Sequence, residues 1–207
     1  SSDFVVVHGD AVPLVVQLSG ESAGKAYLET FTDQGGREKV QLTPIGRDRF
    51  AGRIQVGRED VRYRIRANDA ITRKYVLDAF ERPHVERFEK VYMPPAYTKQ
   101  QPRVVTEEQG DLIALEGSTV QLRIQTNQPV KTAELRVDKT KQKTSVTVLT
   151  PSEDGRVNGE VQLNESGSYR VHLVSAHTGF ENKFSPEYEI RAGADLVPQV
   201  GLDKTST

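Results

Sequence analysis

The sequence contains no cysteine and no tryptophan, and it has one methionine among its 207 residues. The absence of cysteine excludes disulfides, zinc–thiolate sites, iron–sulfur clusters and cysteine nucleophiles. We also find no glycine-rich phosphate loop, no Gly-x-Ser-x-Gly motif and no His-Glu-x-x-His motif. No cofactor is therefore expected from the sequence.

Neither sign of charge is in excess. Lysine and arginine together number 28 and aspartate and glutamate 29, which leaves a formal net charge of −1. A general nucleic-acid-binding protein would be basic, and an acidic solvating tail would be strongly negative. The balance argues against both classes, so no nucleic-acid partner is expected.

Long apolar runs are missing too. The run Phe4–Val7 is far shorter than the ~18 apolar residues that a membrane-spanning helix needs, so no transmembrane segment is expected here. The chain starts at Ser1 without a methionine or an apolar leader, and it ends at Thr207 in mid-pattern. We therefore expect it to be a piece of a longer protein.

What the sequence does contain is apolar residues at every second position. This alternation occurs in residues 12–18, 120–124, 146–148, 161–163, 169–173 and 188–190. It places one set of side chains on a buried sheet face and the other in water. Because the outer positions are polar, we expect antiparallel strands. Many short strands separated by turn signals predict a sandwich or barrel.

The stretch from Ile71 to Phe80 fits two patterns. Ile71, Tyr75 and Ala79 are spaced by four, as in a helix, whereas Tyr75, Leu77 and Ala79 are spaced by two, as in a strand. We predict a strand, because Pro83 ends the stretch and the internal repeat requires a strand at this place.

Two halves of the chain align with each other. Gly9 aligns with Gly117, Leu28 with Leu135, Gly52 with Gly159 and Tyr63 with Tyr169, at separations of 108, 107, 107 and 106 residues. A period of this length corresponds to a whole domain. We predict one sandwich in residues 1–83, a second in residues 84–194, and a linker or the start of a further truncated domain in residues 195–207.

The predicted sandwiches are immunoglobulin-like, of the fibronectin-III-like variety that lacks the cysteine pair and the tryptophan. Tyr169 follows the turn at Gly167 and is two residues before Val171. This is the place of the tyrosine corner, in which the hydroxyl bonds back to the backbone. Tyr63 fits less well, because Val61 stands where the turn glycine would be.

The segment Met93–Tyr97 is stiffened by two prolines. We predict an edge strand and a kink that begin the second sandwich, with Tyr92 and Tyr97 packed on its core.

The blocks Val91–Thr98 and Gly110–Ser118, together with Tyr63–Ile65 and Arg82–Glu86, resemble extracytoplasmic tandem immunoglobulin-like domains of a large, uncharacterised bacterial membrane-protein family. The resemblance covers nearly the whole chain. It implies an extracytoplasmic location, periplasmic or at the cell surface, with membrane anchoring elsewhere in the full protein. It carries no catalytic residues.

Three carboxylates cluster around Gly110. Glu107, Glu108 and Asp111 are candidate ligands for a Ca²⁺ site, since Ca²⁺ takes six to eight oxygen ligands. The cluster lacks the Asp-x-Asp-x-Asp spacing of a dedicated calcium loop, so a solvated acidic turn is the competing interpretation.

Two basic rows are candidate interaction surfaces. Arg62, Arg64 and Arg66 alternate with apolar residues, and Lys139, Lys141 and Lys143 alternate with Thr140 and Gln142. The lysine row is also typical of an edge strand protected against strand addition.

We find no catalytic constellation, and we expect that the chain is not an enzyme. The sequence favours a non-catalytic spacer or protein-binding arm of a larger bacterial membrane protein, with a protein or cell-envelope partner. The alternative is a carbohydrate-binding or accessory β-sandwich module of an extracellular enzyme.

Overall fold

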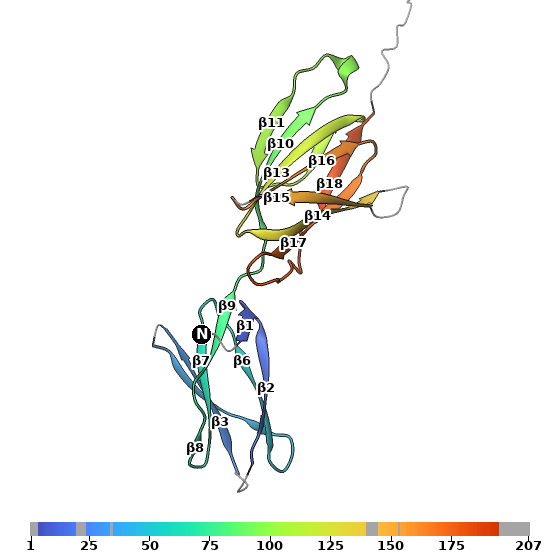
Figure 1. Ribbon diagram of the computed structural model, residues 1–207. Helices are drawn as coiled ribbons and strands as arrows, with labels where there is room; N and C mark the ends of the chain where they lie inside the picture. The colour runs from blue at the N-terminus through green and yellow to red at the C-terminus, as the bar shows by residue number, and fades with distance from the viewer. Residues whose placement is uncertain (1–3, 20–23, 34, 140–144, 153, 195–207) are drawn as a thin grey trace, which may run out of the picture. The chain divides into compact units, whose positions relative to one another are not determined.

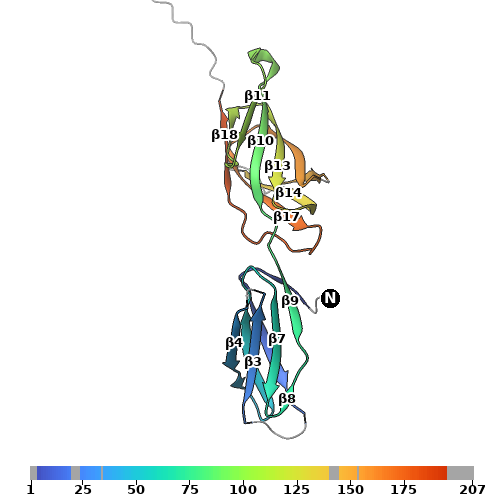
Figure 2. The ribbon, with the colours of Figure 1, turned by 90° about the vertical axis from the view of Figure 1, so that its left-hand side faces the viewer.

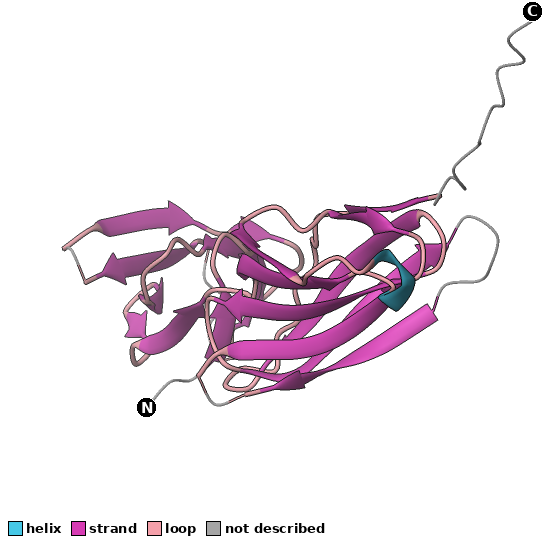
Figure 3. Ribbon diagram, turned by 90° about the horizontal axis from the view of Figure 1, so that it is seen from above, coloured by secondary structure: helices cyan, strands magenta, loops and turns pink. Residues whose placement is uncertain are grey.

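The computed structural model describes residues 4–19, 24–33, 35–139, 145–152 and 154–194. The chain divides into two compact units between Arg82 and Pro83. Nearly all regular structure in the described residues is β-strand, and the one helical element among them is the 3₁₀ turn η1 (Ala96–Thr98) (Figures 1 and 3). The prediction of an all-β fold is confirmed.

The first unit contains two sheets. The larger has the order β1–β9–β7–β3–β4, with β8 paired to β7, and Figure 2 shows β3, β4 and β7 side by side. Its strands are β1 (Phe4–Val7), β3 (Ala26–Thr32), β4 (Arg37–Gln41), β7 (Val61–Ala67), β8 (Ala70–Ile71) and β9 (Tyr75–Phe80). The smaller sheet has the order β2 (Ala11–Gln17), β6 (Arg49–Gln55) and β5 (Thr43–Pro44).

The core of the first unit follows from the alternation in the sequence. Tyr63 and Ile65 of β7 are buried, whereas Arg64 between them points to the outer face. The larger sheet contributes Leu28 and the smaller sheet Ile54 to the same apolar cluster.

The second unit has two layers that share one strand. One layer has the order β11 (Arg103–Glu107), β10 (Val85–Met93), β13 (Ser118–Thr126), β16 (Arg156–Leu163). The other has the order β14 (Val130–Lys139), β17 (Gly167–Ser175), β18 (Tyr188–Gly193), β12 (Leu112–Leu115). Strand β15 (Ser145–Pro151) pairs first with β14 and then, at Thr150 and Pro151, with β16.

Residues that align in the sequence occupy equivalent places in the two units. Gly9 and Gly117 have φ angles of 81° and 82°, which glycine adopts without the strain of a side chain. The N–H of Gly9 donates to the carbonyl of Val56 at 3.0 Å, and the N–H of Gly117 donates to that of Leu163 at 2.7 Å. The repeat therefore extends to individual backbone contacts.

The expectation of antiparallel pairing is wrong for two pairs of strands. β1 runs parallel to β9, and β12 runs parallel to β18. Parallel neighbours require a long connection between them, and here the strands that lie between them in the sequence supply it. Polar outer positions predict the antiparallel pairs correctly but do not indicate where β1 and β12 insert into their sheets.

The ambiguous stretch is a strand, as predicted. β9 covers Tyr75–Phe80 and buries Leu77, whereas Ile71 lies in β8 and is exposed.

The prediction for Met93–Tyr97 is right for one tyrosine and wrong for the other. Tyr92 is buried on β10, but β10 lies between β11 and β13 and is not an edge strand. Tyr97 lies in η1 with 62% of its surface exposed. The two prolines end β10, because proline has no N–H for a ladder and fixes φ.

Candidate functional site

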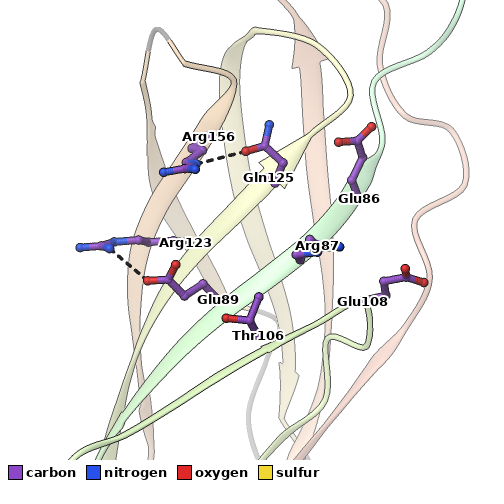
Figure 4. A pocket seen from close by; sticks show the side chains of 8 residues that line it. All are labelled: Glu86, Arg87, Glu89, Thr106, Glu108, Arg123, Gln125 and Arg156. Carbon is purple, nitrogen blue, oxygen red and sulfur yellow. Dashed lines mark hydrogen bonds and ion pairs between the residues drawn. The ribbon is translucent and has the colours of Figure 1, made fainter.

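An open groove of about 710 Å³ lies on the outer face of the second unit. It crosses β11, β10, β13 and β16, and Figure 4 shows the side chains that line it. These are Glu86, Arg87, Glu89, Thr106, Glu108, Arg123, Gln125 and Arg156.

The alternation of each strand positions these residues. Phe88 and Lys90 of β10 are buried, so Arg87 and Glu89 point outward. Arg123 on the neighbouring strand β13 lies directly opposite Glu89. The groove is thus lined by the outward-facing side chains of these strands, and their inward-facing side chains form the core.

A break in the β10 register adds one more acid to the groove. Val85 pairs with Thr126 and Arg87 pairs with Gln125, so Glu86 is an extra residue in β10. A bulge of this kind bends the strand and redirects a side chain. Glu86 and Arg87 consequently both line the groove, although they are neighbours in the sequence.

Part of the charge is paired within the groove. The guanidinium of Arg123 donates to Glu89 Oε1 at 3.0 Å, and Nε of Arg156 donates to Gln125 Oε1 at 3.1 Å (Figure 4). Three glutamates and three arginines line the groove. Their formal charges cancel, so the groove suits a ligand that carries charges of both signs.

Aromatic side chains are absent from the described residues that line the groove. Stacking on the face of a sugar ring is therefore not available there. Arginine and glutamate side chains instead offer charge-assisted hydrogen bonds, which are directional and strong.

The three calcium candidates have separate surroundings. Asp111 accepts hydrogen bonds from the backbone N–H of Glu189 at 2.8 Å and from the Gln109 side chain at 3.0 Å. The Glu189 bond is the main cause that holds the pKa of Asp111 below its usual range, with Gln109 and nearby Lys90 acting in the same direction. Each carboxylate oxygen of Asp111 thus accepts one hydrogen bond from the chain.

Glu107 and Glu108 point to different environments. Nζ of the fully buried Lys90 donates to Glu107 Oε1 and to the carbonyl of Asp111, both at 2.7 Å. Glu108 lines the groove instead. Within the described residues, no group of three or more acidic, histidine or cysteine side chains could hold a metal ion. The cation that contacts Glu107 in the structure is the ammonium group of Lys90.

Tyrosine side chains fix the chain segment that carries these acids. The hydroxyl of the buried Tyr169 donates to the carbonyl of Gly110, 59 residues upstream. The hydroxyl thus bonds to the backbone, but to a distant segment and not to a carbonyl a few residues upstream, as it would in the predicted tyrosine corner. A Cβ at Gly110 would lie 2.4 Å from the ring of Tyr188, so only glycine fits there. Burial raises the pKa of Tyr169 far above its ordinary value.

The predicted arginine row of β7 surrounds a buried acid. Glu29 of β3 has only 2% of its side chain exposed, and Arg64 donates to its Oε2 from Nε at 2.7 Å. Arg37 and Arg66 approach the other oxygen at 3.5 and 3.9 Å. The hydrogen bond from Arg64 is the main cause that lowers the pKa of Glu29. Arg62 forms an ion pair with Asp33, so the row is partly neutralised.

The predicted lysine row is largely outside the described residues. Lys141 and Lys143 lie there, and Lys139 is described as the last residue of β14, paired with Gly167 of β17. β14 pairs with β17 over Val130–Lys139 but with β15 only over Ala133–Val137, so the interpretation of the lysine row as edge protection stays a prediction. β4 is one of the sheet edges in the first unit, since it pairs only with β3 among the described strands.

Sequence reasoning missed the groove and both buried charges. Arg87, Arg123 and Arg156 stand at outward strand positions, where charged residues are ordinary. Glu29 and Lys90 stand in strands rich in apolar residues. A charged residue within an apolar strand was the one sequence signal of a buried charge. The sequence does not show which residue of a neighbouring strand pairs with it, because that depends on the register.

Comparisons with known proteins add little to this geometry. No protein-family profile matches the chain, and no curated protein matches it. Within the described ranges, no helix has the length and apolar character needed to cross a membrane.

The chain is distantly similar to several solved structures. A pullulanase from Anoxybacillus sp. LM18-11 complexed with maltotriose matches with 9% identity and a TM-score of 0.27, over 86% of this chain and 24% of that chain. A tri-modular GH5 endo-beta-1,4-glucanase from Bacillus licheniformis matches with 9% identity and a TM-score of 0.30, over 91% and 37%. The human OSCAR ligand-binding domain matches with 13% identity and a TM-score of 0.29, over 89% and 90%. The chain thus spans about a quarter of the pullulanase, and similarity this weak carries no information on function.

Proposed function

We propose that the chain is a pair of tandem immunoglobulin-like domains with bounds near the predicted ranges 1–83 and 84–194. The strand order of the second unit supports this. Its β10–β13–β16–β15 order corresponds to A–B–E–D, and its β14–β17–β18 order to C–F–G, which are the two sheets of a constant-type sandwich. In the first unit, β2–β6–β5 and β3–β7–β9 correspond to B–E–D and C–F–G.

We propose that this pair is a non-catalytic, protein-binding arm. The single observation that carries the proposal is the charge-balanced groove of the second unit. The side chains of Glu86, Arg87 and Glu108 make no hydrogen bond or ion pair with other described residues. Free charges of both signs on an exposed sheet face suit a protein partner with complementary charges, because such pairs set specificity and association rate.

The location that we propose is extracytoplasmic, as a part of a larger bacterial membrane protein. The sequence resemblance supports this part of the proposal. Residues 195–207, which we interpret as a linker or the start of another domain, lie outside the described residues.

A carbohydrate-binding or accessory role is the competing function. Sugar-binding platforms use aromatic rings, and the described lining of the groove contains none. The groove therefore favours the protein partner.

The experiment places a photo-reactive amino acid at Thr106 in the full-length protein in its native cells. We expect cross-linking to a defined protein, and a loss of at least tenfold in the cross-linked product when Arg87→Glu and Arg123→Glu are combined. The control combines Arg47→Glu and Arg58→Glu, two exposed residues of the first unit, and makes the same total charge change.

Two results would overturn the proposal. One is a cross-linked product that the groove substitutions leave unchanged. The other is binding on a glycan array that the same substitutions abolish, which would instead support the carbohydrate-binding alternative.

A further inference from the structure

The first unit has an unpaired strand edge. β4 pairs with β3 on one side, and no described strand pairs with its other side. All five of its residues are exposed.

The hydrogen-bonding phase of β4 follows from two backbone bonds at its ends. The N–H of Thr32 donates to the carbonyl of Gly36 at 3.0 Å, and the N–H of Leu42 donates to the carbonyl of Ala26 at 2.8 Å. These two pairs are hydrogen-bonded pairs of the antiparallel ladder. Such pairs alternate with non-hydrogen-bonded ones along the strand.

The phase assigns each residue of β4 to one side. Glu38 and Val40 turn their backbone groups toward β3. Arg37, Lys39 and Gln41 turn their N–H and C=O groups away from it, toward the unpaired edge. An added strand would bond to these three residues.

The outer face beside this edge is basic. Arg37 and Lys39 of β4 share it with Arg64 and Arg66 of β7, and Glu29 between them is buried under the arginines. The alternate side chains of an added strand that lie on this face would be adjacent to guanidinium and ammonium groups. Acidic side chains complement that charge.

The inner side of the same edge borders a groove of mixed lining. It has a volume of about 390 Å³ and extends between β4 and β6. Its lining combines the apolar side chains of Leu28, Val40, Ile54 and Val61 with polar and charged ones, among them Glu38, Arg53 and Gln55. The other set of side chains of an added strand would face this groove, which suits apolar residues.

We propose that the edge of β4 accepts an extended segment of a partner protein, in which acidic and apolar residues alternate, as an additional strand. In this mode of recognition, backbone hydrogen bonds supply affinity and alternate side-chain sites supply specificity. The inference rests on the proposed role as a protein-binding arm, but it uses a surface of the first unit and not the groove of the second.

A competing interpretation is that the charges of β4 only protect the edge from unwanted pairing, as exposed lysines do in many proteins. The two interpretations differ in what an acidic, alternating peptide does. A merely protected edge does not pair with such a peptide, whereas an acceptor edge does.

The probe is a synthetic nonapeptide of alternating glutamate and valine, titrated into the whole two-unit chain. A nonapeptide of alternating lysine and valine controls for charge, and polyglutamate and alginate control for simple polyanion binding. Amide hydrogen exchange is read at Arg37, Lys39 and Gln41. We expect the acidic peptide alone to bind and to slow exchange at these three amides.

A matched pair of variants isolates the backbone contribution. Lys39→Gln removes the charge and keeps the N–H, whereas Lys39→Pro removes both, and proline is tolerated where an edge N–H faces solvent. We expect the acidic peptide to bind Lys39→Pro at least tenfold more weakly than Lys39→Gln. The melting temperatures of both variants verify that each is folded.

The inference would be overturned if the acidic peptide did not bind. It would also be overturned if polyglutamate or alginate bound equally well and amide exchange in β4 were not slowed. Combined Arg87→Glu and Arg123→Glu should leave peptide binding unchanged. If the acidic peptide does not bind but cross-linking at Thr106 depends on the groove, the proposal of a strand-accepting edge is rejected and the proposed protein-binding arm is retained.

Discussion

The side chain of Leu42 lies directly over the Cα of Gly52. A Cβ on that glycine would come within 2.3 Å of Leu42 Cδ2. The second unit repeats the arrangement 107 residues later, where a Cβ on Gly159 would come within 2.2 Å of Leu149 Cδ2. Both leucines are buried, so in each unit the glycine leaves the space that a core leucine fills.

We predict that Gly52→Ala and Gly159→Ala each lower the free energy of unfolding by about 1–3 kcal/mol, the usual cost of overpacking a core. Chemical denaturation monitored by circular dichroism measures the change. Gly57→Ala is the control, because no atom lies within 4 Å of a Cβ built there. A cost at Gly52 no larger than at Gly57 would contradict the close packing.

The buried Glu29 should matter for the first unit at neutral pH. Glu29→Gln removes the charge that Arg37, Arg64 and Arg66 surround, so we predict a lower denaturation midpoint. Glu38→Gln, on the exposed strand β4, should have little effect. Because the pKa of Glu29 is lowered in the folded state, its contribution is present at neutral pH and is lost as the pH falls through the folded pKa.

The pH dependence also separates the two variants. The unfolding midpoint of the native chain should fall more on acidification than that of Glu29→Gln, since the variant has already lost the ionised carboxylate. Identical acid profiles for the two would show that Glu29 does not contribute through its charge.

Lys90 should stabilise the second unit through its hydrogen bonds. Lys90→Met keeps most of the side-chain volume but leaves the carbonyl of Asp111 and the carboxylate of Glu107 without this donor. We predict a loss of about 1–3 kcal/mol in the free energy of unfolding, the cost of an unsatisfied buried partner. Lys183→Met, at an exposed position, should change it by no more than about 0.5 kcal/mol. A stability equal to that of the native chain would contradict the role of the ammonium group.

Tyr169→Phe removes the hydroxyl that donates to Gly110. We predict a loss of about 1–3 kcal/mol, because the carbonyl of Gly110 then loses its buried partner. Tyr27→Phe, on the outer face of β3, provides the control. Denaturant unfolding compares the two, and equal costs would contradict the contribution of the Tyr169 bond.

The second unit should lose stability at alkaline pH. Burial raises the pKa of Tyr169, Tyr188 and Tyr92 in the folded state. The unfolded chain then releases these protons more readily, so the contribution is present below a pH of about 10 and is lost above it. Absorbance titration of tyrosinate follows the ionisation directly. Three phenols that titrate near their ordinary pKa without unfolding would contradict this prediction.

The alternation of apolar residues predicted the strands well, because burial on one face is a property of each strand alone. The stretch that ends at Phe80 shows the strength of this signal. There a spacing of four competed with a spacing of two, and the strand was correct. The alignment of Gly9 with Gly117 was likewise visible in the sequence. Both residues have a positive φ angle, which explains why glycine stands at both places.

The sequence did not predict features that depend on which strands become neighbours. The parallel pairing of β1 with β9 and the partners of Glu29 and Lys90 are of this kind. The register places Glu29 directly opposite Arg64, and a shift of one residue would put each side chain on the other face. The three candidate calcium ligands are close in sequence, but Glu107 contacts Lys90 whereas Glu108 lines the groove.

The parallel pairing of β1 with β9 has a mechanical consequence for the first unit. β1 is the first strand of this unit and β9 the last, and four residues of β1 pair with β9 along their shared direction. A force that draws the two ends of the unit apart would slide these strands lengthwise past each other. The bonds of that ladder would then bear the load together, whereas a hairpin pulled at its open end gives way one bond at a time.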